Sequence, residues 1–254
     1  MSEEILNSNG KEGLIATLNK TGYMLEEKAY KLLKDFGAVQ NIVFNNPDDD
    51  RIEIDLIHSK DGVFFIIECK RTEYDWIFTH GLDNKKNVEM IKIENGKLSM
   101  FRYISGDYKI TKHQIGLKVK DDGSIEKTNN KDVMQSKENF NNGVYQLLNN
   151  IDVFLEKSNV VNKKYIIPII VTNAGLFFVE YKENQINNKG NLEDCKFFSE
   201  QSLIFNFPFI MKWQKNGLNE ISGGIGFPSI KSIFVVNISA LKDFIINFDT
   251  PSVY

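Results

Sequence analysis

The chain has 254 residues, is 42% hydrophobic and contains 19 Phe, which is enough apolar material for one large core or two small ones. A formal net charge of −3 excludes a molecule that binds nucleic acid by its overall charge, so contact with phosphate would require a local patch or a bound metal. Two widely separated cysteines, Cys69 and Cys195, exclude a disulfide framework and are expected to be reduced thiols.

Apolar residues at helical spacing predict a first helix from Gly22 to Phe36, with Gly37 as its C-cap, and a short strand near 39–44. Two hairpins are predicted next, over 51–70 and over 90–103, the second turning at Asn95-Gly96. Residues 108–120 predict one or two more strands, and the polar stretch 120–142 is typical of a solvated loop.

A second long helix is predicted from 137 to 157 by its apolar stripe. Buried strands are expected over 165–171, 176–181, 203–213 and 232–237, and a closing helix over 239–246. This order predicts an α/β fold with a mixed β-sheet core flanked by helices. We expect a single domain over 1–254, with a β-rich insertion at 72–136.

The hairpin over 51–70 is the most informative segment. Asp61-Gly62 favours a two-residue type I′ turn, which pairs Lys60 with Val63 and places Asp55 opposite Glu68. Strict alternation would put Glu53, Asp55, Glu68 and Lys70 on one face, and Ile52, Ile54, Leu56, Phe65, Ile67 and Cys69 on the other. Adjacent carboxylates repel each other and are costly to bury, and a divalent cation such as Mg²⁺ or Mn²⁺ relieves both problems.

Glu26 lies on the first helix, with Ala29 and Leu33 at i+3 and i+7, so it faces the packed side. A charge there needs a reason, because burying a lone carboxylate is expensive. A boundary glutamate whose carboxylate reaches water is the alternative interpretation, and the helix alone does not decide between them.

Together, Glu26, Asp55 and the Glu68-Cys69-Lys70 triplet resemble the PD-(D/E)XK nuclease superfamily, in particular its restriction-endonuclease-like, Mrr-type branch. Leu25-Glu26, the Leu32-Leu33 pair and Gly37 match the first helix of that branch, and 167–174 resembles its fourth core strand. The resemblance covers roughly 20–75 and 138–182. The insertion at 72–136 and Cys69 depart from the common pattern.

The resemblance implies a restriction-endonuclease-like core in which Asp55, Glu68 and the Cys69 carbonyl bind Mg²⁺ or Mn²⁺. Lys70 would orient a water or the phosphate, Glu26 would hold a second metal or its water, and Gln146 on the second helix would position the lysine or the nucleophile. Glu53, opposite Lys70, is expected to be a neutralising partner or a rim residue rather than a metal ligand. The implied function is DNA phosphodiester hydrolysis by a restriction or anti-phage type endonuclease, with homodimerisation expected by analogy alone.

Two alternatives remain open at this stage. An inactive nuclease-like domain would bind nucleic acid or a protein partner, or an active one would cut RNA or a branched junction. Asp48, next to Pro47, is a weaker candidate than Asp55, and 48–50 is expected to be a solvated turn. His58, His80 and His113 lack metal-ligand spacing, and the glycine-rich run 222–227 is expected to be a turn. No apolar signal core or membrane-length run is present, so a cytoplasmic protein without membrane contact is expected.

Overall fold

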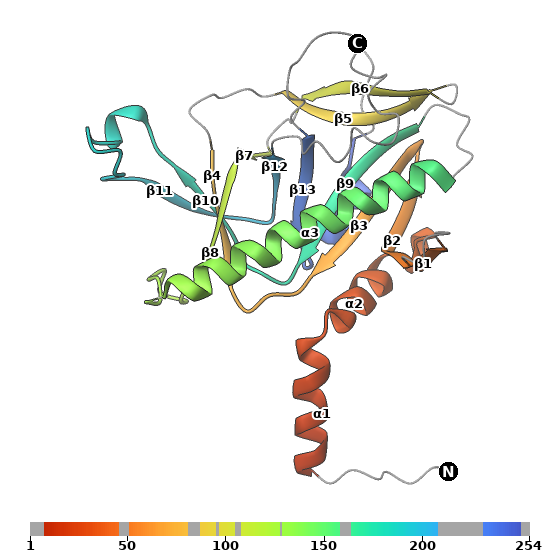
Figure 1. The fold of residues 1–254 in the computed structure, drawn as a ribbon, viewed down its shortest axis with the longest axis horizontal. Helices are drawn as coiled ribbons and strands as arrows, with labels where there is room; N and C mark the ends of the chain where they lie inside the picture. The colour runs from red at the N-terminus through yellow and green to blue at the C-terminus, as the bar shows by residue number, and fades with distance from the viewer. Residues whose placement is uncertain are drawn as a thin grey trace.

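The computed structural model describes residues 8–45, 51–80, 87–94, 97–104, 108–127, 129–157, 164–207 and 231–249. Within these ranges the chain forms two β-sheets with helices packed on them (Figure 1). The helices are α1 (Ser8–Lys20), α2 (Tyr23–Leu33), α3 (Asn130–Lys157) and α4 (Leu241–Asn247), with short 3₁₀ turns at Lys34–Phe36 and Glu183–Gln185.

The larger sheet has the strand order β1-β2-β3-β9-β13-β12-β7, and the β5–β6 hairpin joins it through antiparallel pairing of β5 with β9. The sheet is mixed, because β3, β9 and β13 run parallel while β1, β2 and β12 are antiparallel to their neighbours β2, β3 and β13. Its strands are β1 (Val39–Asn45), β2 (Arg51–Lys60), β3 (Val63–Lys70), β5 (Asn87–Glu94), β6 (Lys97–Ile104), β7 (Ile110–Thr111), β9 (Lys164–Thr172), β12 (Ser202–Phe207) and β13 (Lys231–Asn237).

The smaller sheet has the order β11-β10-β4-β8. Its strands are β4 (Asp75–Thr79), β8 (His113–Leu117), β10 (Leu176–Glu180) and β11 (Lys196–Glu200). The described strands of 72–136 therefore do not form a separate subdomain. Strands β5 and β7 pair into the larger sheet, whereas β4 and β8 pair into the smaller one.

Helices cover both faces of the larger sheet, and α3 crosses one of them (Figure 1). Its buried side chains, including Phe140, Leu147 and Ile151, pack with Ile66 and Ile170 in one core cluster. Residues of α2 and α4 pack in a second cluster on the opposite face, with Phe65, Ile67 and Cys69 of β3. The predicted mixed sheet flanked by helices is confirmed at this level.

The first predicted helix is confirmed as α2 and its 3₁₀ extension, and Gly37 ends it with φ 84°. The predicted loop over 120–142 is wrong from residue 130 onward, because α3 already begins at Asn130. Asn129 accepts a hydrogen bond from the Asp132 amide at 3.0 Å, which caps the helix. Ser136 lies so close to Gly116 of β8 that a Cβ built on Gly116 would be 1.7 Å from Ser136 Oγ. This contact packs the early part of α3 against the smaller sheet.

Helix α1 was not expected from the sequence. It projects away from the two sheets (Figure 1), and its large apolar residues Leu14, Ile15 and Leu18 are exposed. No described helix is both long and apolar enough to cross a membrane.

Candidate active site

The β2–β3 hairpin has the predicted register. Its pairs run from Lys60↔Val63 to Leu56↔Ile67, around a turn in which Asp61 and Gly62 have φ 47° and 83°. Positive φ at both central positions is what a type I′ turn requires, and Asp-Gly meets that requirement at low cost.

Asp55 lies where this pairing gives way. Its Oδ2 accepts a hydrogen bond from the Cys69 amide at 2.7 Å, so a side chain occupies the place of a backbone acceptor of β2. The N–H and C=O of one strand residue point to the same edge, so the Cys69 carbonyl also faces Asp55. The three oxygen donors predicted for a metal therefore come from neighbouring positions of β2 and β3.

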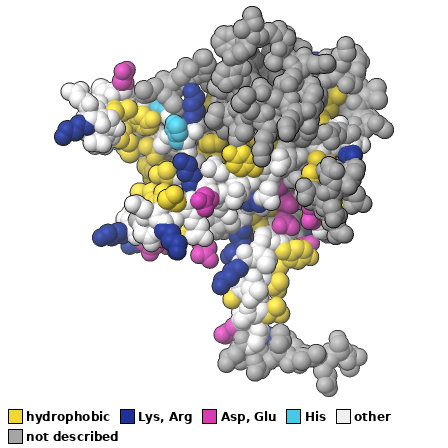
Figure 2. Space-filling model, in the orientation of Figure 1, with side chains coloured by type: hydrophobic (Ala, Val, Ile, Leu, Met, Phe, Trp, Pro, Cys, Tyr) yellow, Lys and Arg dark blue, Asp and Glu magenta, His cyan; other side chains and the backbone are white. Residues whose placement is uncertain are grey.

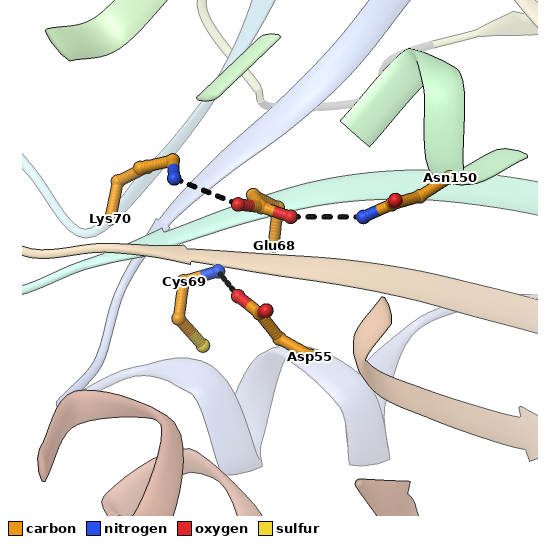
Figure 3. Close-up of polar contacts among 5 residues, drawn as sticks. All are labelled: Asp55, Glu68, Cys69, Lys70 and Asn150. Atoms are coloured by element: carbon orange, nitrogen blue, oxygen red, sulfur yellow. Dashed lines mark hydrogen bonds and ion pairs between the residues drawn. The ribbon is translucent and has the colours of Figure 1, made fainter. Parts of the chain in front are cut away.

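Strict alternation along β2, which the sequence analysis assumed, is wrong at this point. Ile54 packs in the cluster on the α3 face, whereas Leu56 packs in the cluster on the α2 and α4 face. The break coincides with Asn41 of β1, which has φ 53° and lies between the pairs Gln40↔Leu56 and Ile42↔Ile54. As a result, Asp55 reaches β3 from the side opposite to Glu68 (Figure 3).

Glu68 points toward α3 and is 3% exposed. Its Oε1 forms an ion pair with Lys70 Nζ at 2.8 Å, and its Oε2 accepts a hydrogen bond from Asn150 Nδ2 at 3.0 Å (Figure 3). Both carboxylate oxygens are therefore held, one by the neighbouring strand position and one by the long helix. In this structure Lys70 pairs with Glu68 and not with Glu53, and Glu53 is exposed, as expected of a rim residue.

Gly143 of α3 allows Lys70 to lie close to the helix. A Cβ built on Gly143 would be 2.7 Å from Lys70 Cγ, well inside contact distance. Gly143, Gln146 and Asn150 are spaced at i, i+3 and i+7, so they lie on neighbouring positions of one helix face. The predicted Gln146 is exposed on this face, and within the described residues no hydrogen bond joins it to Glu68 or Lys70.

The α3 side-chain amide that contacts Glu68 is thus that of Asn150, one turn beyond Gln146. Sequence analysis did not single it out, although a signal was present: Asn150 is an amide inside an apolar stripe, next to Leu147 and Ile151. A buried polar side chain in such a stripe needs a partner, and Glu68 is that partner.

Glu26 is half-buried on α2, with its Oε1 3.1 Å from a Cβ built on Gly22 at the start of the helix. Burial raises its pKa to about 7, and the charges of Asp55 and Glu53 add to the effect. The Lys70 cation acts in the opposite direction. Glu26 is therefore electrostatically part of the same acidic group, although it lies outside the hydrogen-bonded set.

Burial also raises the pKa of both strand carboxyls. For Glu68 it reaches about 7, with burial the largest cause and the charge of Asp55 the next, against the opposing effect of Lys70. Burial raises the pKa of Asp55 as well, although the Cys69 amide and Lys70 favour its charged form. Three acidic side chains, Glu26, Asp55 and Glu68, thus lie near the Lys70 cation, which cannot neutralise all of them.

This donor set fits a hard divalent cation. Asp55, Glu68 and the Cys69 carbonyl provide oxygens, and Mg²⁺ typically binds one or two carboxylates and completes its shell with water and substrate phosphate. Among the described residues, no three His, Cys, Asp or Glu side chains are grouped closely enough to form a metal cage by themselves. The donor types therefore suit a metal held by two carboxylates and a main-chain oxygen. Asp55 and Glu68 lie on opposite sides of β3, however, so Glu68 would have to leave Lys70 and turn before both carboxylates could bind the same ion.

The chain beyond Lys70 is held in place by Asn173, which follows β9. Its Oδ1 accepts from the Thr72 amide at 2.9 Å, and its Nδ2 donates to the Thr72 carbonyl at 2.9 Å. This two-way contact fixes how the chain leaves the site. No local pattern indicates this contact, because the two residues are 101 positions apart.

The remaining candidates do not add to the site. His58 is buried and stacks on Phe65, His80 packs against Phe178 and Tyr181, and His113 is exposed. The Cys69 thiol is buried and its pKa is raised well above the usual value, chiefly by burial, so its carbonyl is the relevant group. Residues 48–50 and 222–227 lie outside the described residues.

Comparison of the chain with protein-family models, with curated proteins and with solved structures gave no match. Any assignment of function must therefore rest on the geometry and electrostatics of the site itself.

Proposed function

We propose that the chain is a metal-dependent nuclease that hydrolyses DNA phosphodiester bonds, as a restriction or anti-phage type endonuclease with a PD-(D/E)XK-like site. The observation that carries the proposal is the arrangement of Asp55 and Glu68 around Cys69, with Lys70 2.8 Å from Glu68. Two buried carboxylates with pKa values raised by burial are costly to the fold, and such groups cluster at functional sites.

Asp55, Glu68 and the Cys69 carbonyl would hold Mg²⁺ or Mn²⁺. Bound there, the metal would lower the pKa of a coordinated water and stabilise negative charge on the phosphate. The Cys69 amide holds Asp55, and Asn150 and Lys70 hold Glu68 on the other side of β3, so a metal bound to both carboxylates would have to displace Lys70 from Glu68.

Lys70 supplies positive charge beside Glu68. Its ammonium neutralises Glu68 in the structure and, once a metal takes that role, becomes available to donate hydrogen bonds to a phosphate oxygen or the attacking water. Glu26, with a pKa of about 7, can accept a proton from water near neutral pH.

The proposal is tested by titrating Mn²⁺ and Mg²⁺ into the wild type and Asp55→Asn in a calorimeter, and incubating both with supercoiled plasmid at low salt. Asn at position 55 keeps an acceptor for the Cys69 amide but removes the charge. We expect metal binding and nicking by the wild type, and loss of both in the variant. Metal binding by the wild type without cleavage of DNA, RNA or branched substrates would support a binding domain, and absence of metal binding would overturn the proposal.

A further inference from the structure

A polar pocket lies beside the proposed active site. Its volume is about 190 Å³, and residues from three elements line it: Lys20 at the end of α1, Arg71, Thr72 and Glu73 after β3, and Ser136 and Asn139 of α3. Figure 2 shows basic side chains where α1 meets the body of the molecule, which is the junction that these residues share. The pocket is smaller than a typical cofactor site, so it suits a single small group.

The pocket adjoins Lys70 along two elements. Arg71 and Thr72 follow Lys70 directly in the chain, and Asn139 lies one helical turn before Gly143, which contacts the Lys70 side chain. One turn of helix advances about 5.4 Å. Asn173 holds the backbone of Thr72, so this wall of the pocket is fixed.

The lining favours an anion. Lys20 and Arg71 provide two cationic groups, and within the described residues neither forms an ion pair with a carboxylate. Glu73 is the single carboxylate among the lining residues, and it is exposed. Ser136 Oγ and Asn139 Oδ1 are buried and make no hydrogen bond to any described residue. The Ser136 hydroxyl can donate a proton, whereas Asn139 Oδ1 is an acceptor and only the Nδ2 of that side chain can donate. A hydroxyl and an amide that can donate, beside two cations, are groups that bind a phosphate.

We propose that this pocket binds the backbone phosphate next to the scissile one, so that it positions the strand on Asp55, Glu68 and Lys70. The inference rests on the proposed function and deepens it by naming a substrate contact. A phosphate contact carries no sequence information, so the pocket contributes affinity and alignment that do not depend on the bases. It also provides the local positive patch that a chain of net charge −3 needs to hold a polyanion.

The test measures binding of two fluorescently labelled DNA duplexes of unrelated sequence, in EDTA and over a range of salt concentrations. The proteins are the full-length wild type, Lys20→Gln, Arg71→Gln and Arg71→Lys. Lys189→Gln is the matched control, since Lys189 lies in an exposed turn between β10 and β11. Thermal melting establishes that each variant is folded.

We expect each Gln variant to bind both duplexes several-fold more weakly and to lower the slope of log K against log salt by about 0.9, the value for one phosphate contact. Arg71→Lys should retain most of the slope, and Lys189→Gln should match the wild type. Unchanged affinity and slope in both Gln variants would overturn the proposal that the pocket binds a phosphate. An effect confined to one duplex would also overturn it, because it would indicate contact with a base.

Nicking of supercoiled plasmid by the wild type is recorded in parallel, so that the two proposals can fail separately. If the wild type nicks DNA while the Gln variants bind normally, the pocket inference alone is overturned. If the wild type neither binds nor nicks, both the pocket inference and the proposed function are overturned.

Discussion

The Asp55 carboxylate accepts a hydrogen bond from the Cys69 main-chain amide at 2.7 Å, at the point where the pairing of β2 with β3 ends. The same carboxylate thus satisfies a partly buried backbone donor and provides an oxygen for a metal. The two roles can be separated by mutation, because the first needs only an acceptor while the second needs a charge.

Replacing Asp55 by Asn and by Ala should therefore have different effects on stability and the same effect on cleavage. Asp55→Ala leaves the Cys69 amide without an acceptor, which should cost about 1–3 kcal/mol of the free energy of unfolding. Asp55→Asn should be less destabilising, because its amide oxygen can still accept. Both should lose DNA cleavage. Urea denaturation in EDTA measures the stabilities, and equal losses would contradict a role for the Asp55–Cys69 bond.

Asn150 is expected to act through Glu68. Its amide donates to Glu68 Oε2 at 3.0 Å and so favours the charged carboxylate, and Asn150→Ala should raise the pKa of Glu68 further. We expect about 10- to 100-fold weaker Mg²⁺ binding and a rise of cleavage with pH that moves to higher pH. The pH profile is the deciding measurement, because general destabilisation would lower activity without moving it. Gln146→Ala, altering the neighbouring exposed amide, is the comparison.

The raised pKa of Glu68 predicts how stability depends on pH. Its pKa of about 7 in the folded chain lies above the usual value of 4.5, so the folded state binds more protons between these values. The free energy of unfolding should therefore decrease as pH rises through this interval. Glu68→Gln removes the effect and should therefore be more stable than the wild type at pH 8.

Melting temperatures at pH 5 and pH 8 in EDTA test this expectation. The advantage of Glu68→Gln should be present at pH 8 and small at pH 5. Glu138→Gln, which alters an exposed glutamate on α3, serves as the control and should not change the pH dependence. If Glu68→Gln changed the melting temperature equally at both pH values, the raised pKa of Glu68 in the folded chain would be contradicted.

Two glycines provide a matched pair for testing the close contact between α3 and Lys70. A Cβ on Gly143 would be 2.7 Å from Lys70 Cγ, whereas a Cβ on Gly13 in α1 meets no atom within 4 Å. Ala in place of helical Gly stabilises a helix by about 0.5–1 kcal/mol, and Gly13→Ala should show this gain with normal cleavage. Gly143→Ala should displace Lys70 and reduce cleavage strongly. Similar cleavage rates for the two variants would contradict the packing of Lys70 on α3.

The register of the hairpin was predictable because its determinants are local. Asp61-Gly62 defines the turn, and the apolar run 63–67 predicts a strand, which is buried on both faces. The broken alternation at Asp55 was not predictable, since it depends on the conformation of Asn41 in the neighbouring strand. Asp55 consequently lies in the predicted place along the chain but approaches β3 from the other side.

The contribution of α3 was only partly predictable, for a similar reason. Its apolar stripe indicated a helix, but Asn150 lies 82 residues from Glu68, and nothing local marks their contact. The first turns of α3 carry mostly polar residues and resemble a loop, and their helical structure depends on the cap from Asn129 and the contact with β8. Tertiary contacts, and not local composition, therefore determine that these turns are helical.

Lys70 tests the central claim most directly, because it separates a metal site from a nuclease. The measurement is the rate at which supercoiled plasmid is nicked at saturating Mg²⁺, for the wild type and for Lys70→Met. We predict that the wild type nicks DNA and that Lys70→Met does not, while the variant binds Mn²⁺ at least as tightly because Glu68 is no longer paired. Equal nicking rates for the two proteins, or no nicking by the wild type, would contradict the assignment of Asp55, Glu68 and Lys70 as a phosphodiesterase site.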